Sequence, residues 1–302
     1  MRYNITRKVL IFWCLFIGIG ALFGSFGMLI DPTGKAMGMD KMLPYFQVLP
    51  FANILFQNFI FSGISLLVVN GITNIVASIL LIKKKKLGII LGGFFGITLM
   101  LWIIIQFVIF PANFMSTIYF IFGFIQMITG YMCYVFYRQE MFKVNENDYK
   151  NIGTNKKELV VFFSRMGYTK KIAFDIANSS GAEILEIKTK EKTSGTLGFW
   201  WCGRYSMHGL AMPIEKINKD LTKYEKVTIC TPIWVFGISG PIKEFCKLYS
   251  GSLKNVDYVF VHFMNAKFTI LADETDNLLK TKRKKFTSVC SRFGKIKSSK
   301  TL

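Results

Sequence analysis

Histidine is scarce in this sequence, and the residue types that usually hold metals do not cluster. The 302-residue chain has two histidines, His208 and His262, and six cysteines that form no Cys-x-x-Cys pair. None of these residues falls at the spacing of zinc ligands. Because both histidines lie after position 137, a bis-histidine haem within the apolar N-terminal part is excluded. We interpret the cysteines as small buried side chains with reduced thiols.

Charged residues are missing from four long apolar stretches in the first 137 positions. A bilayer span needs roughly 20 apolar residues, and the stretches predict transmembrane helices at about 9–30, 57–82, 87–110 and 114–137. The sequence therefore predicts an N-terminal all-α transmembrane four-helix region at 1–137. We read the first stretch as a retained helix rather than a signal peptide, since no small-residue cleavage site follows it.

Basic residues around these stretches predict their orientation. Arg2, Arg7 and the four lysines at 83–86 lie on the same side as everything after residue 137, and the more basic side of a membrane protein faces the cytoplasm. We therefore expect a multi-pass protein of the cell membrane, in contact with the lipid bilayer, with both termini in the cytoplasm.

The predicted spans contain no ionisable side chain, which argues against an ion or proton pathway. They do contain or adjoin five amides: Asn58, Asn70, Asn74, Gln106 and Gln126. Amides at such positions usually join helices through hydrogen bonds, and a site for a lipid or quinone headgroup is the functional alternative. An anchor is the leading interpretation of this region.

The rest of the chain is basic too, and the net charge of the whole sequence is +20. A basic chain can bind nucleic acid, but no zinc-finger, helix-turn-helix or RNA-binding signature is present, so no nucleic acid is expected as a partner. With membrane spans attached, attraction to anionic lipid headgroups is the simpler explanation. A nucleic-acid binder stays a third possibility, which would require salt-sensitive binding that survives deletion of residues 1–137.

Beyond a polar linker at 138–157, apolar strand patterns alternate with helical patterns. Five strands are predicted, at about 159–163, 182–187, 226–231, 256–263 and 286–293. Strands that alternate with helices form parallel sheets with right-handed crossovers. We therefore expect a cytoplasmic α/β domain at 158–302, with a doubly wound parallel five-stranded sheet and a basic C-terminal tail.

A tight polar loop follows the first predicted strand. The apolar run ends at Phe163, and a helical pattern begins directly after Ser164, Arg165, Met166, Gly167, Tyr168 and Thr169. Unpaired N–H groups at a helix N-terminus favour an anion. Gly167 lets a ligand approach the backbone, and the hydroxyls of Ser164 and Thr169 flank the loop. The loop is therefore predicted to bind a phosphate group.

At these residues the sequence resembles the flavodoxin family, whose flavin-phosphate loop reads roughly Ser/Thr-x-Thr-Gly-x-Thr after the first strand. Met166 stands where the family has a hydroxyl residue, so one hydrogen bond to the phosphate should be missing. A second segment is similar to the Pro-x-Trp segment that such proteins place beside the flavin ring: Thr231, Pro232, Ile233, Trp234, Val235, Phe236 and Gly237. The resemblance implies a flavodoxin-like fold with FMN as the cofactor.

The resemblance also implies flavin contacts from the loop after the fourth strand, where the family has a glycine and an aromatic residue. Here the loop has no glycine, and the contacts would come from Asn265 and from Phe268, which would cover the outer face of the flavin. The similar region runs from about 158 to 263, a third of the chain.

The implied function is FMN-dependent electron transfer by a membrane-anchored protein, with an oxidoreductase as the implied class of enzyme. The sequence leaves the redox partners open. A nicotinamide donor would need a second dinucleotide fingerprint, and none appears, while a membrane quinone is suggested by location alone. The alternative is a flavin-free scaffold or sensor domain tethered to the membrane, because a fold does not fix a function.

An aromatic insertion at 195–209 follows the second predicted strand. We hypothesise that its residues Trp200, Trp201 and Tyr205 line a substrate or partner surface near the flavin ring. The alternative is that these aromatic residues form a cluster that faces the membrane or the protein core. His208 lies in the same insertion, and a role for it as a general acid is a guess.

Overall fold

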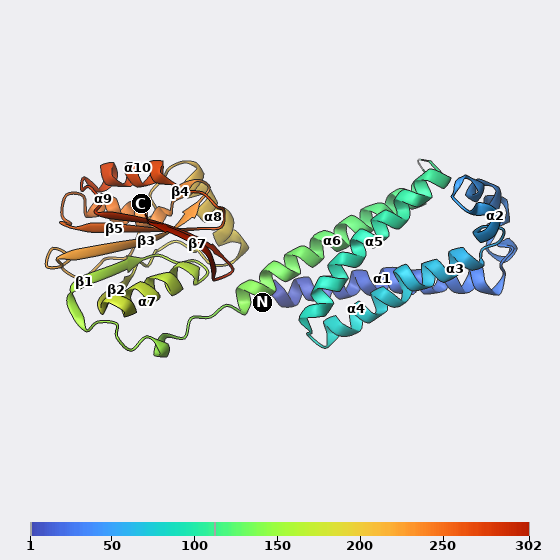
Figure 1. Cartoon of the computed structure of the whole chain (residues 1–302), viewed down its shortest axis with the longest axis horizontal. Helices are drawn as coiled ribbons and strands as arrows, with labels where there is room; N and C mark the ends of the chain where they lie inside the picture. Colours follow the sequence, from blue (N-terminus) through green and yellow to red (C-terminus); the bar gives the residue numbers. More distant parts are fainter. Residues whose placement is uncertain (1, 112, 302) are drawn as a thin grey trace. The chain divides into compact units, whose positions relative to one another are not determined.

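The computed structural model describes residues 2–111 and 113–301. The chain divides into two compact units, with the boundary between Glu140 and Met141. One unit is helical and the other contains a β-sheet (Figure 1).

Four helices of the first unit are long and apolar enough to cross a membrane. They are α1 (Arg2–Ile30), the continuous helix Ile60–Ile82, α5 (Lys86–Ile109) and α6 (Phe114–Glu140). The second consists of α3 (Ile60–Leu66), a π-helical segment η3 (Leu67–Ile72) and α4 (Thr73–Ile82). The connection before it holds short helices: η1 (Lys35–Met37), η2 (Asp40–Val48) and α2 (Ala52–Leu55).

The predicted helix bounds differ from the observed ones mainly at the charged ends. Helix α1 begins at Arg2 rather than near residue 9, and α6 continues to Glu140. Polar residues at these ends stay helical because they have partners: the Arg7 guanidinium donates a hydrogen bond to the Leu81 carbonyl oxygen at 2.8 Å. The second span begins at Ile60, three residues later than predicted.

Glycines and amides join the four helices. A Cβ atom placed on Gly96 would lie 2.5 Å from the carbonyl oxygen of Gly123, so α5 and α6 are in backbone contact there. The fully buried Gln126 donates hydrogen bonds to Asn74 Oδ1 at 2.8 Å and to the Gly92 carbonyl oxygen at 2.9 Å. For Gln126 and Asn74, the prediction that amides join helices is confirmed.

The second unit is built on a mixed sheet with the strand order β2-β1-β3-β5-β6-β7, and the short β4 pairs with β3. Strands β1, β2, β3, β5 and β6 are parallel, whereas β4 is antiparallel to β3 and β7 is antiparallel to β6. Their bounds are β1 Asn155–Phe162, β2 Ala182–Glu186, β3 Lys226–Trp234, β4 Gly237–Ile238, β5 Val256–His262, β6 Lys285–Arg292 and β7 Lys295–Thr301.

The sheet is therefore not the purely parallel five-stranded sheet that was predicted. The basic tail forms β7, because the two-residue turn of Phe293 (φ 51°) and Gly294 (φ 78°) returns the chain immediately along β6. Lysines at 295, 297 and 300 then lie on the sheet edge, where charge opposes pairing with other chains.

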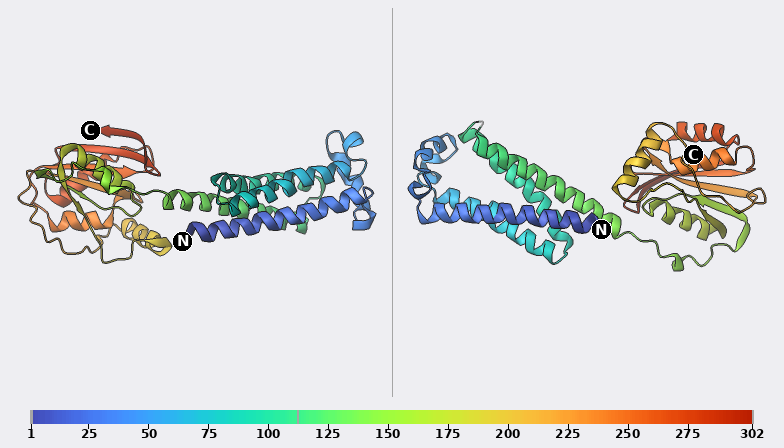
Figure 2. Two further views of the ribbon diagram at one scale, coloured as in Figure 1. Left: turned by 90° about the horizontal axis from the view of Figure 1, so that it is seen from below. Right: turned by 180° about the vertical axis from the view of Figure 1, so that it is seen from behind.

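Helices cover both faces of the sheet (Figures 1 and 2). Successive residues of β1 alternate between the two cores: Leu159 and Val161 face the core with α9 and α10, whereas Val160 and Phe162 face the core with α7. The helices are α7 (Tyr168–Ser180), α8 (Gly195–Met207), α9 (Gly240–Leu248) and α10 (Thr269–Leu279).

Candidate functional site

Three loops meet the edge of the sheet where the parallel strands end. Strand β1 pairs with β2 on one side and with β3 on the other. The order of the chain therefore reverses between β1 and β3, and ligands of open α/β sheets bind outside the strand ends at such a point. The predicted site residues lie in the loops after β1, β3 and β5 or in the strand and helix ends that adjoin these loops.

The loop after β1 ends in an uncapped helix N-terminus. Gly167 has φ 85° and is the N-cap residue of α7, and no side chain caps this end. Among residues 2–111 and 113–301, no protein acceptor is bound by the backbone N–H groups of Ser164, Met166, Gly167 or Thr169. Unpaired donors at the positive end of a helix dipole suit an anion such as phosphate.

The side chains of this loop differ in their exposure to solvent. Thr169 is buried, whereas Ser164, Arg165, Met166 and Tyr168 are partly exposed. The Arg165 guanidinium lies 5.4 Å from the centre of the Phe199 ring of α8. Backbone N–H groups, rather than a ring of hydroxyls, are thus the main donor set that this loop presents.

The loop after β3 is a strained hairpin. Trp234 pairs with Gly237, and the two turn residues between them both have positive φ, 44° for Val235 and 63° for Phe236. This turn type favours asparagine and glycine, and a β-branched residue there is an outlier. Both side chains are exposed, at 51% for Val235 and 68% for Phe236. Strain of this kind concentrates at functional sites.

Trp234 connects the two loops. Its half-buried ring lies edge-on to that of Phe163, with 5.4 Å between the ring centres, and Phe163 directly precedes Ser164. The phosphate-type loop and the Trp234 turn are therefore neighbours, as the resemblance implied. Phe163 itself was not predicted to take part, since its contact with Trp234 joins residues far apart in the sequence.

Thr231, Pro232 and Ile233 lie within β3 rather than in the loop. The Thr231 side chain is fully buried, its hydroxyl lies 3.0 Å from Ser239 Oγ, and it accepts a hydrogen bond from the Ser239 backbone N–H at 3.2 Å. These contacts hold the hairpin closed. The hydroxyl of the buried Thr231 side chain is therefore engaged within the hairpin.

The loop after β5 turns away from the expected arrangement. Phe268 packs against the core, 4.8 Å from the His262 ring, and so does not stand free to cover a flavin. Asn265 is exposed, with its Oδ1 3.5 Å from Ser298 Oγ of β7. Phe263 is the exposed ring of this loop, at 53%.

His262 explains that turn, and no sequence pattern predicted its contacts. Its Nδ1 contacts the Met264 carbonyl oxygen, and its Nε2 lies 2.7 Å from Ser288 Oγ. Ser288 Oγ also lies 2.9 Å from the Ala266 carbonyl oxygen. Burial lowers the pKa of His262, so the neutral imidazole is favoured. The pair His262 and Ser288 thus fixes the loop to β6.

The aromatic insertion forms α8, and its rings are divided between two environments. Trp201 Nε1 donates to Glu191 Oε2 at 2.9 Å, and the Tyr205 hydroxyl donates to Glu191 Oε1 at 3.2 Å. Trp200 is 70% exposed and does not join them. Burial raises the pKa of the Cys202 thiol to about 11, which keeps it protonated and unreactive at neutral pH.

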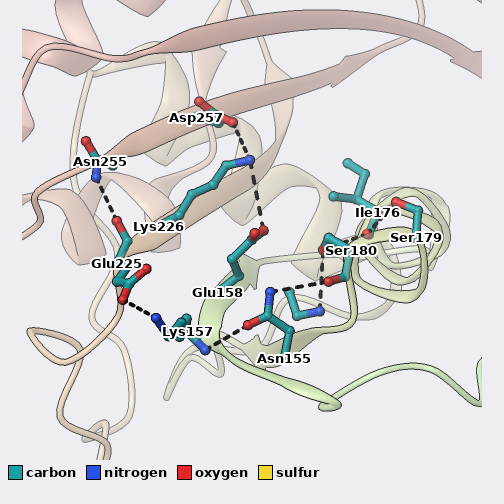
Figure 3. Close-up of polar contacts among 11 residues, drawn as sticks. Asn155, Lys157, Glu158, Ile176, Ser179, Ser180, Glu225, Lys226, Asn255 and Asp257 are labelled. Atoms are coloured by element: carbon teal, nitrogen blue, oxygen red, sulfur yellow. Dashed lines mark hydrogen bonds and ion pairs between the residues drawn. The ribbon is translucent and has the colours of Figure 1, made fainter.

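A hollow of about 410 Å³ lies at the opposite edge of the sheet, where the strands begin. Three of its charged groups are paired with one another (Figure 3): Lys226 Nζ lies 3.1 Å from Asp257 Oδ2 and 4.0 Å from Glu158 Oε2. In the described residues, no group of three or more His, Cys, Asp or Glu side chains could hold a metal ion. The hollow is therefore a weaker candidate site than the three loops at the ends of β1, β3 and β5.

Comparisons with known proteins give structural neighbours only. No family model matches the chain, and no curated protein matches it. A Lactobacillus acidophilus flavoprotein crystallised with FMN is 21% identical, with a TM-score of 0.38, over 43% of this chain and 91% of that one. Proteins assigned as flavoproteins from Bacteroides eggerthii and Bacteroides uniformis are 19% and 20% identical, with TM-scores of 0.40 and 0.38. Both matches cover 46% of this chain. They cover 91% of the Bacteroides eggerthii protein and 94% of the Bacteroides uniformis protein.

Proposed function

We propose that the sheet unit binds FMN across the loops after β1 and β3 and transfers electrons. The observation that carries this proposal is the uncapped N-terminus of α7, with unpaired backbone donors, beside the strained Trp234 turn. An anion site and an exposed aromatic turn at one switch point fit the two ends of a flavin mononucleotide.

The residues present fit the two parts of the cofactor differently. The backbone of Ser164 to Thr169 would hold the phosphate, with Met166 offering no hydroxyl. Trp234, Val235 and Phe236 would flank the ring, and backbone groups of Val235 and Gly237 would reach its edge. Asn265 stays a proposed contact from the third loop. When bound, FMN supplies the transfer of electrons, and the protein sets its access and potential.

We further propose that the helical unit is a multi-pass anchor in the cell membrane, with both termini in the cytoplasm. Its four apolar helices and the basic turn at 83–86 support this. An FMN-dependent oxidoreductase that uses a nicotinamide donor or a membrane quinone is the reaction class to examine first. The lipid bilayer is the proposed partner of the helices.

A flavin-free scaffold is the second candidate function, and two observations favour it. Phe268 is partly buried against the core, and Met166 removes a phosphate-binding hydroxyl. Under this alternative, the loop edge would keep its shape without taking up a cofactor.

The deciding experiment is FMN retention by the full chain in detergent. We expect the purified protein to keep a flavin absorption spectrum after gel filtration, and Trp234→Ala to lose most of it. Leu248→Ala is the control, because that apolar side chain is 60% exposed at the end of α9, in none of the three loops, and its loss should leave retention unchanged. A wild-type protein that remains colourless after incubation with FMN would reject flavin binding and leave the scaffold function.

A further inference from the structure

The segment 141–154, which joins the two units in sequence, is not a free linker. We call it the strap, because it follows α7 from one end to the other. Glu146 accepts a hydrogen bond from Lys170 Nζ at 2.6 Å, near the start of α7. Asn151 donates from its backbone N–H to Asn178 Oδ1 at 3.0 Å, near the end of α7. The strap falls within the stretch 138–157 that the sequence predicted to be a polar linker.

Tyr149 holds the middle of the strap. Its hydroxyl donates to Asp175 Oδ1 at 3.0 Å, and its ring centre lies 5.3 Å from that of Phe174. Burial and the Asp175 carboxylate raise the pKa of Tyr149 to about 12, so this contact persists at neutral pH. Tyr149 and Ile152 also pack against the core on the α7 side of the sheet. The strap is therefore held by apolar packing as well as by surface polar contacts.

Phe142 begins the strap and lies against the proposed phosphate loop. Its ring centre is 4.8 Å from that of Tyr168, the first residue of α7. A Cβ atom on Gly167 would lie 3.4 Å from the ring, and one on Gly294 would lie 1.9 Å from it. The ring thus fills the space between the loop after β1 and the β6–β7 turn, and at Gly294 only glycine leaves room for it.

We infer that Phe142 is a positioning residue for the phosphate loop, and this rests on the proposed FMN function. Its ring supports Gly167 and Tyr168, which set the direction of the donor groups at the start of α7. An ordered loop and a docked strap therefore favour each other. By linkage, FMN that binds the ordered loop must also favour the docked strap.

Phe142 lies close in the sequence to the helical unit. It follows Glu140, the last residue of α6, with only Met141 between them. Occupancy of the phosphate loop is thereby linked to the order of the chain that leaves the last candidate membrane helix.

The test uses the full chain in detergent with two readouts, FMN affinity and tryptic cleavage of the strap. Lys143 and Lys150 are exposed strap residues at which trypsin cuts. We expect FMN to slow cleavage of the wild type. Phe142→Ala should raise the Kd for FMN about fivefold or more and should abolish this protection. Phe142→Leu, which keeps apolar packing, should fall between the two.

Met141→Ala is the matched control, since Met141 is the exposed neighbour of Phe142. It should bind FMN like the wild type and show the same protection, and circular dichroism should show that all variants are folded. If the wild type binds FMN but Phe142→Ala binds equally tightly with unchanged protection, the inference is wrong while the proposed function stands. If the wild type binds no FMN, the proposed function is rejected and the coupling with it.

Discussion

The two units use glycine for opposite purposes. In the helical unit, Gly96 and Gly130 have ordinary helical backbones and bring α5 and α6 into contact, with a Cβ on Gly130 only 2.3 Å from the Gly93 Cα atom. In the sheet unit, Gly167 and Gly294 have positive φ and shape loops at the strand ends. Substitution in the first unit should therefore damage packing, and substitution in the second should damage binding first.

The largest effect should come from Gly96→Ala. Its new Cβ would meet the Gly123 carbonyl oxygen and the Met127 nitrogen at 2.5 and 2.6 Å, and backbone atoms cannot move aside as a side chain can. We expect a loss of about 3 kcal/mol in the stability of the helical unit. Thermal unfolding in detergent measures it, with retention of FMN by the sheet unit as the second readout.

Gly20→Ala is the control for that substitution, because the nearest atom to its new Cβ would be the Tyr119 hydroxyl at 3.9 Å. It should be neutral or slightly stabilising, since alanine favours helix. Equal unfolding temperatures for the two variants would contradict the backbone contact between α5 and α6.

Gln126→Leu should have the next largest effect. It would leave Asn74 Oδ1 and the Gly92 carbonyl oxygen without their buried donor. We expect a loss of about 2 kcal/mol in the helical unit. Gln47→Leu, in the exposed η2 segment, should change little by comparison. Unfolding in detergent measures the stability of each variant. An unchanged or higher stability of Gln126→Leu would show that the hydrogen bonds of this amide do not stabilise the packing of the helices.

Gly167→Ala should separate binding from folding in the sheet unit. A left-handed backbone costs an alanine about 1 kcal/mol, and Gly251 provides a matched site, with φ 72° and nothing within 4 Å of a new Cβ. Both variants should lose similar stability, but only Gly167→Ala should weaken FMN binding, by about tenfold or more. Parallel titrations and denaturant curves test this, and equal FMN affinities would place the phosphate elsewhere.

The smallest effect should be the pH dependence from His262. Burial lowers its pKa below the ordinary value near 6.5, so the unfolded chain takes up the proton first. Its contribution to stability is present above pH 6.5 and is lost as the pH falls towards the lower folded pKa. We expect denaturant midpoints of the sheet unit to fall from pH 7 to pH 5. His262→Asn should flatten that slope, and His208→Asn, at an exposed position, should not.

The sequence predicted the framework of both units because periodicity and apolar runs carry it. Each of the five predicted strands is present, within a few residues of its expected bounds. The missed elements lack such signals. The Val235–Phe236 turn contains no glycine or asparagine, α8 is rich in glycine and tryptophan, and the basic β7 has no apolar alternation.

The candidate site was less predictable than the fold, because its decisive contacts join distant residues. The loop after β1 followed from local pattern, whereas the inward turn of Phe268 depends on His262 and Ser288. Likewise, the strap residues Phe142 and Tyr149 look like linker until α7 is folded beside them. Local sequence indicates where a loop begins, and only packing determines what it faces.

The central claim is that the loop from Ser164 to Thr169 binds the phosphate of a flavin. The most direct test compares the affinity of the full-length protein for FMN with its affinity for riboflavin, which lacks the phosphate. Several charge-assisted hydrogen bonds to backbone donors should make FMN bind at least about tenfold tighter, and Gly167→Ala should shrink the ratio. Equal affinities for the two flavins, or no binding of either, would contradict the account.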